Sequence, residues 1–348
     1  MKKQCAILLT IIMMAISFIP FAKADAADRD LFVVSENVGP LSRESGAGRV
    51  KAYPISIGET GFSVIDEHVE YWIGRFDYSV ETEMPDYVNG FPEAYYDACP
   101  EQGTVSVVSR ENEKKWSSPI CVYTPYGYEN ESDRTYNVVF LVSGSGGNMY
   151  NWLRDEYGGM TGNKLFDWLI YTKRADPFIA VSVNLNSYDG YHYCYADYQD
   201  LADRIERYYL PYMVRTYRTF ADSAERSDIA AAKEHFMIAG LSQGAICLSC
   251  IALDPDQYLG ECFGNIVLMS NYVYGDSVSK KFGDSDSKLF FVDGGKADSN
   301  RGGSPHDITN GYKKFENLKT AQFFEFDSGH AWFTWFRGIA SVLQVAMK

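Results

Sequence analysis

Residues 236–244 form an apolar run that ends in a Gly-x-Ser-x-Gly motif, Phe236-Met237-Ile238-Ala239-Gly240-Leu241-Ser242-Gln243-Gly244. The motif opens a helical pattern that continues to residue 253. Where a strand turns sharply into a helix, a serine in the turn is held in strained backbone geometry with its hydroxyl exposed. Glycines on either side avoid contacts with the neighbouring chain. The stretch therefore predicts a strand–turn–helix unit with Ser242 as a nucleophile.

Strand and helix patterns alternate over the rest of the chain from about residue 99. Strands are expected at 104–109, 120–124, 137–143, 178–185, 235–239, 266–269, 289–293 and 322–326. Helical patterns lie at 164–173, 198–220, 243–253, 308–318 and 332–345, and Pro211 should bend or divide the longest of them. Several strands are apolar almost throughout, as in parallel strands covered on both faces. The pattern predicts an α/β fold, a doubly wound, mostly parallel sheet with helices on both faces.

The N-terminal segment has the order of a secretory signal peptide. Lys2 and Lys3 precede an apolar stretch at 6–21, and small-residue cleavage patterns follow at 22–26. We therefore predict a signal peptide at 1–26, a secreted protein, and no membrane span after cleavage. Residues 27–98 carry no chemical motif. We expect a β-rich extension packed on the main domain, rather than a separate module, before an enzyme domain at 99–348.

Composition excludes several classes of protein. Of the 348 residues, 46% are hydrophobic and 22% charged, which is typical of a globular protein with a core. The net charge of −14 argues against a nucleic-acid partner, because a polyanion repels such a surface. Cys247-x-x-Cys250 has no second cysteine pair or histidine at zinc spacing, so we expect neither a metal site nor a redox pair there.

A serine nucleophile needs a base. The histidines after Pro100 are His192, His235, His306 and His330. The first precedes the nucleophile in the chain, the second begins the strand that leads to it, and the third has no strand just before it. His330 follows the last strand pattern, where folds of this kind place the base. We therefore predict His330 as the general base.

The acid that orients the base should come between the two in the chain. Asp293 lies at the edge of an apolar strand pattern, whereas Asp298 lies on the loop beyond, where it can reach the histidine Nδ1. Asp298 is our choice and Asp293 the alternative. The order Ser242, Asp298, His330 is that of the α/β-hydrolases. A second oxyanion donor should come from the glycine-rich turn at 143–147, which lacks the ending of a phosphate loop.

Several stretches together resemble carbohydrate esterase family 1, the feruloyl and acetyl-xylan esterases related to esterase D. They are residues 121–128, 136–147 with Trp152, 210–212, 216–219, 238–244, and Gly329-His330 with Trp335. The likeness covers about residues 99–348. It implies an α/β-hydrolase fold, the triad Ser242, Asp298 and His330, an oxyanion hole of the Gln243 and Ser145 backbone N–H groups, and no metal or other cofactor.

The chain departs from this family at two positions. Ser143 stands where the family usually has histidine, and Gln243 where it usually has methionine. Because the oxyanion hole uses backbone groups, neither change removes a catalytic atom. The first change alters the wall of the expected substrate pocket, to which we assign Ser143, Gly146 and Trp152.

These residues predict a secreted serine esterase that hydrolyses feruloyl or acetyl esters on plant cell-wall polysaccharide, through an acyl-enzyme. Its partner would be xylan or a feruloylated or acetylated oligosaccharide. Two alternatives remain. An acyltransferase or peptidase could use the same triad, because a fold does not choose the acceptor. A carbohydrate-binding protein on a hydrolase scaffold would bind such ligands without turnover.

Overall fold

The computed structural model describes residues 32–38, 63–66, 69–73, 99–110, 119–153, 162–171, 173–185, 195–252, 258–270, 287–293, 321–325, 330 and 332–347. Asp298 and the helix expected at 308–318 lie outside these residues. In the described part, no helix has both the length and the apolar character needed to span a bilayer.

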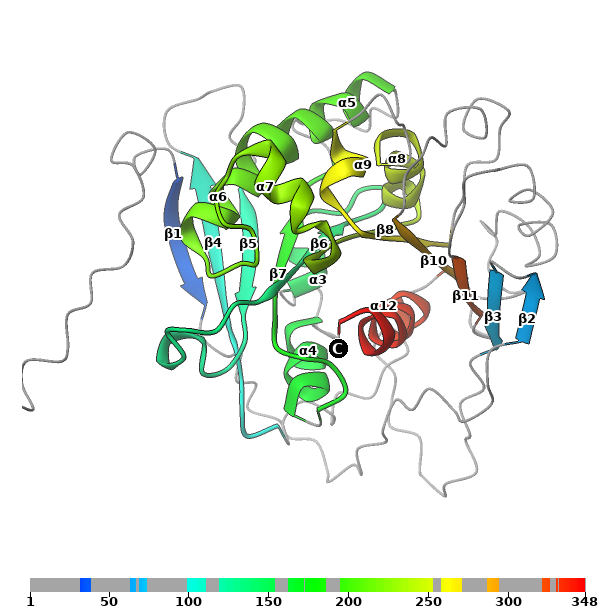
Figure 1. The fold of residues 1–348 in the computed structure, drawn as a ribbon, viewed down its shortest axis with the longest axis horizontal. Helices are drawn as coiled ribbons and strands as arrows, with labels where there is room; N and C mark the ends of the chain where they lie inside the picture. The colour runs from blue at the N-terminus through cyan, green and yellow to red at the C-terminus, as the bar shows by residue number, and fades with distance from the viewer. Residues whose placement is uncertain are drawn as a thin grey trace, which may run out of the picture.

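One eleven-stranded sheet runs through the molecule in the order β1-β4-β5-β7-β6-β8-β9-β10-β11-β3-β2 (Figure 1). Its strands are β1 Phe32–Val38, β2 Ser63–Asp66, β3 Val69–Ile73, β4 Thr104–Arg110, β5 Ile120–Thr124, β6 Asn137–Val142, β7 Phe178–Val183, β8 Phe236–Leu241, β9 Asn265–Met269, β10 Lys288–Asp293 and β11 Ala321–Glu325. From β7 across to β3 every neighbouring pair is parallel. The predicted mostly parallel sheet is confirmed.

Helices cover both faces of this sheet, as predicted (Figure 1). One face carries α5 Tyr195–Arg204, α6 Leu210–Thr216, α7 Arg226–Ala231, α8 Gln243–Ile251 and α9 Leu259–Cys262. The other carries α3 Tyr150–Leu153, α4 Gly162–Tyr171 and α12 Trp332–Ala346. Two apolar cores result, one on each side of the central strands. Short 3-10 turns lie at Tyr128–Asn130 (η2) and Lys233–His235 (η4).

The stretch 27–98 contributes strands at both edges of the sheet. β1 pairs antiparallel with β4 at one edge, and β3 pairs parallel with β11 at the other, with β2 outermost. These strands share the sheet of the main domain. The function of this stretch and the domain boundary at residue 98 stay predictions.

Pro211 lies where the long helical pattern divides. A π-helical segment, η3 Ile205–Tyr209, separates α5 from α6, and Pro211 occupies the first turn of α6. Proline has no N–H to donate to the preceding turn, so the regular hydrogen-bond ladder cannot continue through it. The chain stays helical without a gap from 195 to 216, and a π-helical turn interrupts the regular hydrogen-bond pattern just before Pro211.

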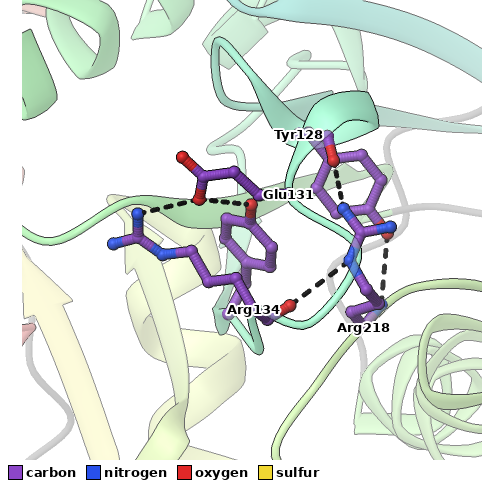
Figure 2. Close-up of polar contacts among 5 residues, drawn as sticks. Tyr128, Glu131, Arg134 and Arg218 are labelled. Atoms are coloured by element: carbon purple, nitrogen blue, oxygen red, sulfur yellow. Dashed lines mark hydrogen bonds and ion pairs between the residues drawn. The ribbon is translucent and has the colours of Figure 1, made fainter.

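Arg218 joins the chain after α6 to the segment between β5 and β6 (Figure 2). Its side chain donates to the carbonyls of Tyr128 and Arg134, the latter at 3.3 Å from Nε. The guanidinium lies 3.9 Å from the centre of the Tyr128 ring, a cation–π contact. Next to it, Tyr136 forms a β-bridge with Thr219. These contacts, which we call the Arg218 clamp, lie at the end of the sheet where the central strand β6 begins, away from Ser242.

Asp167 of α4 is a buried acid at the same end of the sheet. Its Oδ1 accepts hydrogen bonds from the Gly103 N–H at 2.7 Å and the Tyr123 hydroxyl at 2.8 Å. Burial raises the pKa of this carboxyl to about 7, although both hydrogen bonds favour the charged form. The folded protein therefore holds a proton on Asp167 that the unfolded chain releases near pH 4.

This difference predicts a pH-dependent effect of Asp167→Asn. Between about pH 4 and 7 the native state binds the extra proton, so the contribution of Asp167 to stability falls as pH rises and levels off above 7. Asparagine keeps the accepting oxygen and does not titrate. Relative to wild type, the variant should gain on the order of 2–3 kcal/mol in unfolding free energy from pH 4.5 to 8. Denaturant titrations at both pH values measure this gain; a constant difference would contradict it.

Candidate active site

Ser242 occupies the turn between β8 and α8. Its backbone has φ 51° and ψ −116°, a conformation that residues with a side chain rarely adopt. Its N–H donates to the Met269 carbonyl at 2.8 Å, and its own carbonyl accepts from Ala245 and Ile246 at the start of the helix. The turn is thus fixed by β9 on one side and by α8 on the other.

Both glycines of the motif are required by close backbone contacts. A Cβ on Gly240 would lie 2.6 Å from the backbone carbon of Gly244. A Cβ on Gly244 would lie 2.6 Å from the carbonyl oxygen of Ser143. Real Cβ atoms do not approach backbone so closely. The Gly-x-Ser-x-Gly pattern therefore reflects how tightly the turn packs on itself and on the loop after β6.

The loop at 143–147 lies directly against Ser242. A Cβ on Gly144 would come within 2.8 Å of Leu241 Cδ1 and 3.1 Å of Ser242 Cβ. Gly146 has φ 68°, which favours glycine, and the Gly147 N–H donates to the Gly144 carbonyl at 3.0 Å. The structure thus brings the predicted oxyanion loop beside the predicted nucleophile, and Ser145 is exposed there.

His330 reaches Ser242 from the segment between β11 and α12. Its Nε2 lies 3.0 Å from Ser242 Oγ, although 88 residues separate the two in the chain. Trp335, on the first turn of α12, meets the imidazole edge to face, with ring centroids 5.0 Å apart. Its indole Nε1–H donates to Ser270 Oγ at 2.9 Å. An imidazole held this way is poised to take the serine proton.

The candidate acid Asp293 ends β10, two strands along the sheet from β8, and Asp298 comes later in the chain. The Asp293 backbone pairs with Glu325 of β11. Because β10 and β11 are parallel, both strands end on the same side of the sheet. Asp298 is outside the described residues, and its assignment as the acid stays a prediction.

Two residues assigned to the substrate pocket are buried within the loop region. Ser143 is fully buried, and its hydroxyl donates to the Asn148 carbonyl at 3.0 Å. Trp152 is fully buried between Trp332 and Phe336, with edge-to-face contacts. Neither side chain is therefore exposed at the surface. Gly146, by contrast, is exposed beside Ser145.

Gln243, the predicted first oxyanion donor, begins α8. The first N–H groups of a helix have no acceptor within the helix, and the helix dipole favours negative charge at that end. The Gln243 side chain turns to α5, where its amide donates to the Tyr198 hydroxyl. The residue that replaces the usual methionine therefore makes a polar contact that methionine does not offer.

His235 lies at the opposite end of β8 from Ser242, as predicted. Its ring stacks on Phe220 at 3.5 Å, and its Nδ1 lies 2.8 Å from Asn137 Oδ1. Desolvation by burial lowers the pKa of His235. Among the described residues, no group of three or more His, Cys, Asp or Glu side chains could hold a metal ion.

Sequence reasoning did not identify Ser270 or Asn184 as part of this region. Ser270 follows β9 with φ 58° and receives the Trp335 hydrogen bond. Asn184 follows β7 and accepts from the Met149 N–H at 2.6 Å. A polar residue at the carboxyl end of a parallel strand is the signal that could have found both, since that edge carries the site.

Comparison with known proteins bears on the fold. No family model matches the chain. The chain is 24% identical over 192 residues to endo-1,4-beta-xylanase Y of Acetivibrio thermocellus, a match that covers 55% of this chain and 16% of the xylanase. The chain thus spans a small part of that protein.

Solved structures of feruloyl esterases resemble it over a longer stretch. The feruloyl esterase module from Clostridium thermocellum complexed with sinapinate superposes with a TM-score of 0.60 at 17% identity, over 73% of this chain and 91% of the module. This chain has the fold of the feruloyl esterases. A carbohydrate esterase family 1 ferulic acid esterase from Anaeromyces mucronatus gives a TM-score of 0.54 at 16% identity, over 76% of this chain and 99% of that one. The predicted α/β-hydrolase fold and the resemblance to this family are confirmed.

The strain at Ser242 predicts an unusual order of stability for two variants. Alanine at this position keeps the unfavourable φ, whereas glycine relieves it. At ordinary positions glycine costs about 0.5–1 kcal/mol relative to alanine. At residue 242 we expect Ser242→Gly to be more stable than Ser242→Ala by about 1 kcal/mol or more. Denaturant unfolding of both variants measures the difference, and an alanine variant of equal or greater stability would show that the turn is unstrained.

Proposed function

We propose that the protein is a secreted serine esterase that hydrolyses feruloyl or acetyl esters on plant cell-wall xylan. Ser242 is the nucleophile, His330 the general base and Asp298 the acid that orients it. The observation that carries the proposal is the 3.0 Å approach of His330 Nε2 to Ser242 Oγ at a strained strand-to-helix turn. Nucleophile and base within hydrogen-bond reach are the signature of an activated serine.

The reaction follows from this arrangement. Ser242 Oγ attacks the ester carbonyl while His330 Nε2 takes its proton, and a tetrahedral oxyanion forms. His330 then gives the proton to the leaving sugar hydroxyl, which leaves an acyl group on Ser242. Water, activated by the same imidazole, releases the acid. Asp298 holds the imidazole in the required tautomer and stabilises its cation.

The oxyanion would meet backbone donors at the N-terminus of α8. Gln243 is the first residue of that helix, so its backbone N–H lies at the helix N-terminus. The loop that carries Ser145 lies against Ser242. Donors that are already in place stabilise charge as it develops, without reorganisation. Because Gly144 brings the loop backbone next to Ser242, this second donor needs no side chain.

Feruloyl groups are proposed from the relatives, and acetyl groups from the resemblance of the sequence to a family that includes acetyl-xylan esterases. The solved structures named above are feruloyl esterases, one of them complexed with sinapinate, and the curated relative is a xylanase. The chain is also rich in aromatic residues, which suit aromatic and sugar ligands, although most of them pack the protein itself.

Ser242→Ala should abolish turnover on the preferred ester and preserve the fold. Loss of the covalent step lowers kcat about 10⁶-fold in well-studied triad enzymes. Substrate binding and oxyanion stabilisation still leave a rate about 10³–10⁴-fold above that of the uncatalysed reaction in water. Activity should be measured on a panel of feruloyl, acetyl and peptide substrates. Turnover restricted to peptides would favour a peptidase, and binding of xylan oligosaccharides without any turnover would favour a carbohydrate-binding protein.

The two candidate acids can be separated by substitution. Asp298→Asn should lower kcat by up to about 10⁴, because the amide holds the wrong histidine tautomer. Asp293→Asn should have a much smaller effect, since its backbone lies in β10 rather than on the loop beyond. Kinetics of both variants on one ester measure the difference. The reverse order would assign the role to Asp293.

Export is proposed from the N-terminal pattern. The charged, apolar and small-residue order at 2–26 predicts a mature N-terminus at or near Asp25 or Ala27. Mass spectrometry of the protein from the medium or the envelope should find it there. Intact Met1 on protein confined to the cytosol would contradict this proposal.

A further inference from the structure

Arg204 is a buried cation at the end of α5. Only 1% of it is exposed, and its guanidinium donates to the carbonyls of Asn184 at 3.2 Å and Leu185 at 3.0 Å. Asp200, one helical turn earlier, forms an ion pair at 3.2 Å whose geometry is not that of a hydrogen bond. Burial of a guanidinium is unfavourable unless its donors are used. Here two of them fix the chain where it leaves β7.

Asn184 connects the segment that Arg204 holds to the loop expected to form the oxyanion hole. Its Oδ1 accepts a hydrogen bond from the Met149 N–H at 2.6 Å. Met149 is buried and follows Asn148, whose carbonyl accepts from the Ser143 hydroxyl at 3.0 Å. A continuous set of hydrogen bonds and chain neighbours therefore runs from Arg204 to the residue that begins the loop beside Ser242.

The same helix also contacts the other half of the proposed oxyanion hole. Tyr198, 6% exposed, accepts from the side chain of Gln243 at the start of α8, and α5 packs along α8. Figure 1 shows the two helices on the same face of the sheet. One helix thus contacts the start of α8 directly and reaches the loop at 143–149 through Asn184.

We propose that Asn184 is a positioning residue for the oxyanion hole. Held by Arg204, it sets the position of the loop at 143–149 relative to Ser242, and so the place of the Ser145 N–H. This inference rests on the proposed function, because the loop is expected to meet an ester oxyanion. Hydrogen-bond donors stabilise the oxyanion only if they lie about 2.7–3.1 Å from the developing charge. A displaced loop therefore reduces the stabilisation of the transition state more than it reduces substrate binding.

The test compares two variants of Asn184 on a chromogenic acetate ester. Asn184→Leu has a similar volume but no acceptor, whereas Asn184→Asp keeps an oxygen at the same place. We expect Asn184→Leu to lower kcat about 10–100-fold with KM changed by no more than about twofold. Asn184→Asp should recover kcat to within a few-fold of wild type.

Asn265→Leu serves as the matched control. Asn265 is fully buried, whereas Asn184 is partly exposed. The Asn265 side chain donates to the Glu234 carbonyl at 3.0 Å, and the residue begins β9 at the end of the sheet opposite to Ser242. This variant should lower the melting temperature and leave kcat unchanged, with all assays run well below each melting temperature. Unchanged kcat in Asn184→Leu, an equal fall in Asn184→Asp, or a proportional rise in KM would overturn the inference. Absence of ester turnover by the wild-type protein would overturn the proposed function, and this inference with it.

Discussion

The close packing of backbone around Ser242 is the constraint on which the rest of the site depends. Three segments, the end of β8, the start of α8 and the loop after β6, approach so closely that Gly240, Gly244 and Gly144 leave no room for a Cβ. This packing forces Ser242 to φ 51° and turns its hydroxyl to the sheet edge. It also places loop backbone beside the serine, so nucleophile and proposed oxyanion donors are set by one arrangement rather than by separate side chains.

Around this turn, the parallel sheet gathers residues that are far apart in the chain. Ser242 follows β8 and Ser270 follows β9, while Asp293 ends β10 and His330 lies beyond β11. Because these four strands are parallel neighbours, the residues after them lie at the same end of the sheet. Trp335 then supports His330 from α12. The opposite end carries the structural contacts instead, with the Arg218 clamp and the buried Asp167.

Sequence reasoning reached the parallel sheet, its longer described helices and the approach of His330 to Ser242, because each depends on a local pattern or on chain order. Apolar runs located the strands from β4 to β11 to within one or two residues, whereas β1, β2 and β3 were expected only as a β-rich stretch. The pairing of Ser242 with His330 followed from their order. Sequence reasoning placed Asn184 inside a strand expected at 178–185, since periodicity cannot show where strand pairing stops; the strand ends at Val183. Arg204 lies within the helical pattern expected at 198–220, and only tertiary packing shows that it is buried. The left-handed backbone of Ser270 had no local signal either.

The central claim, that Ser242 is an activated nucleophile, is tested most directly by covalent labelling with a serine-directed fluorophosphonate. An unactivated serine hydroxyl does not react with such a reagent, whereas one paired with a base does. The account predicts a single adduct, mapped by peptide mass spectrometry to Ser242, that is absent from Ser242→Ala and slowed strongly in His330→Ala. No adduct on the folded wild-type protein, or an adduct on a different residue, would contradict it.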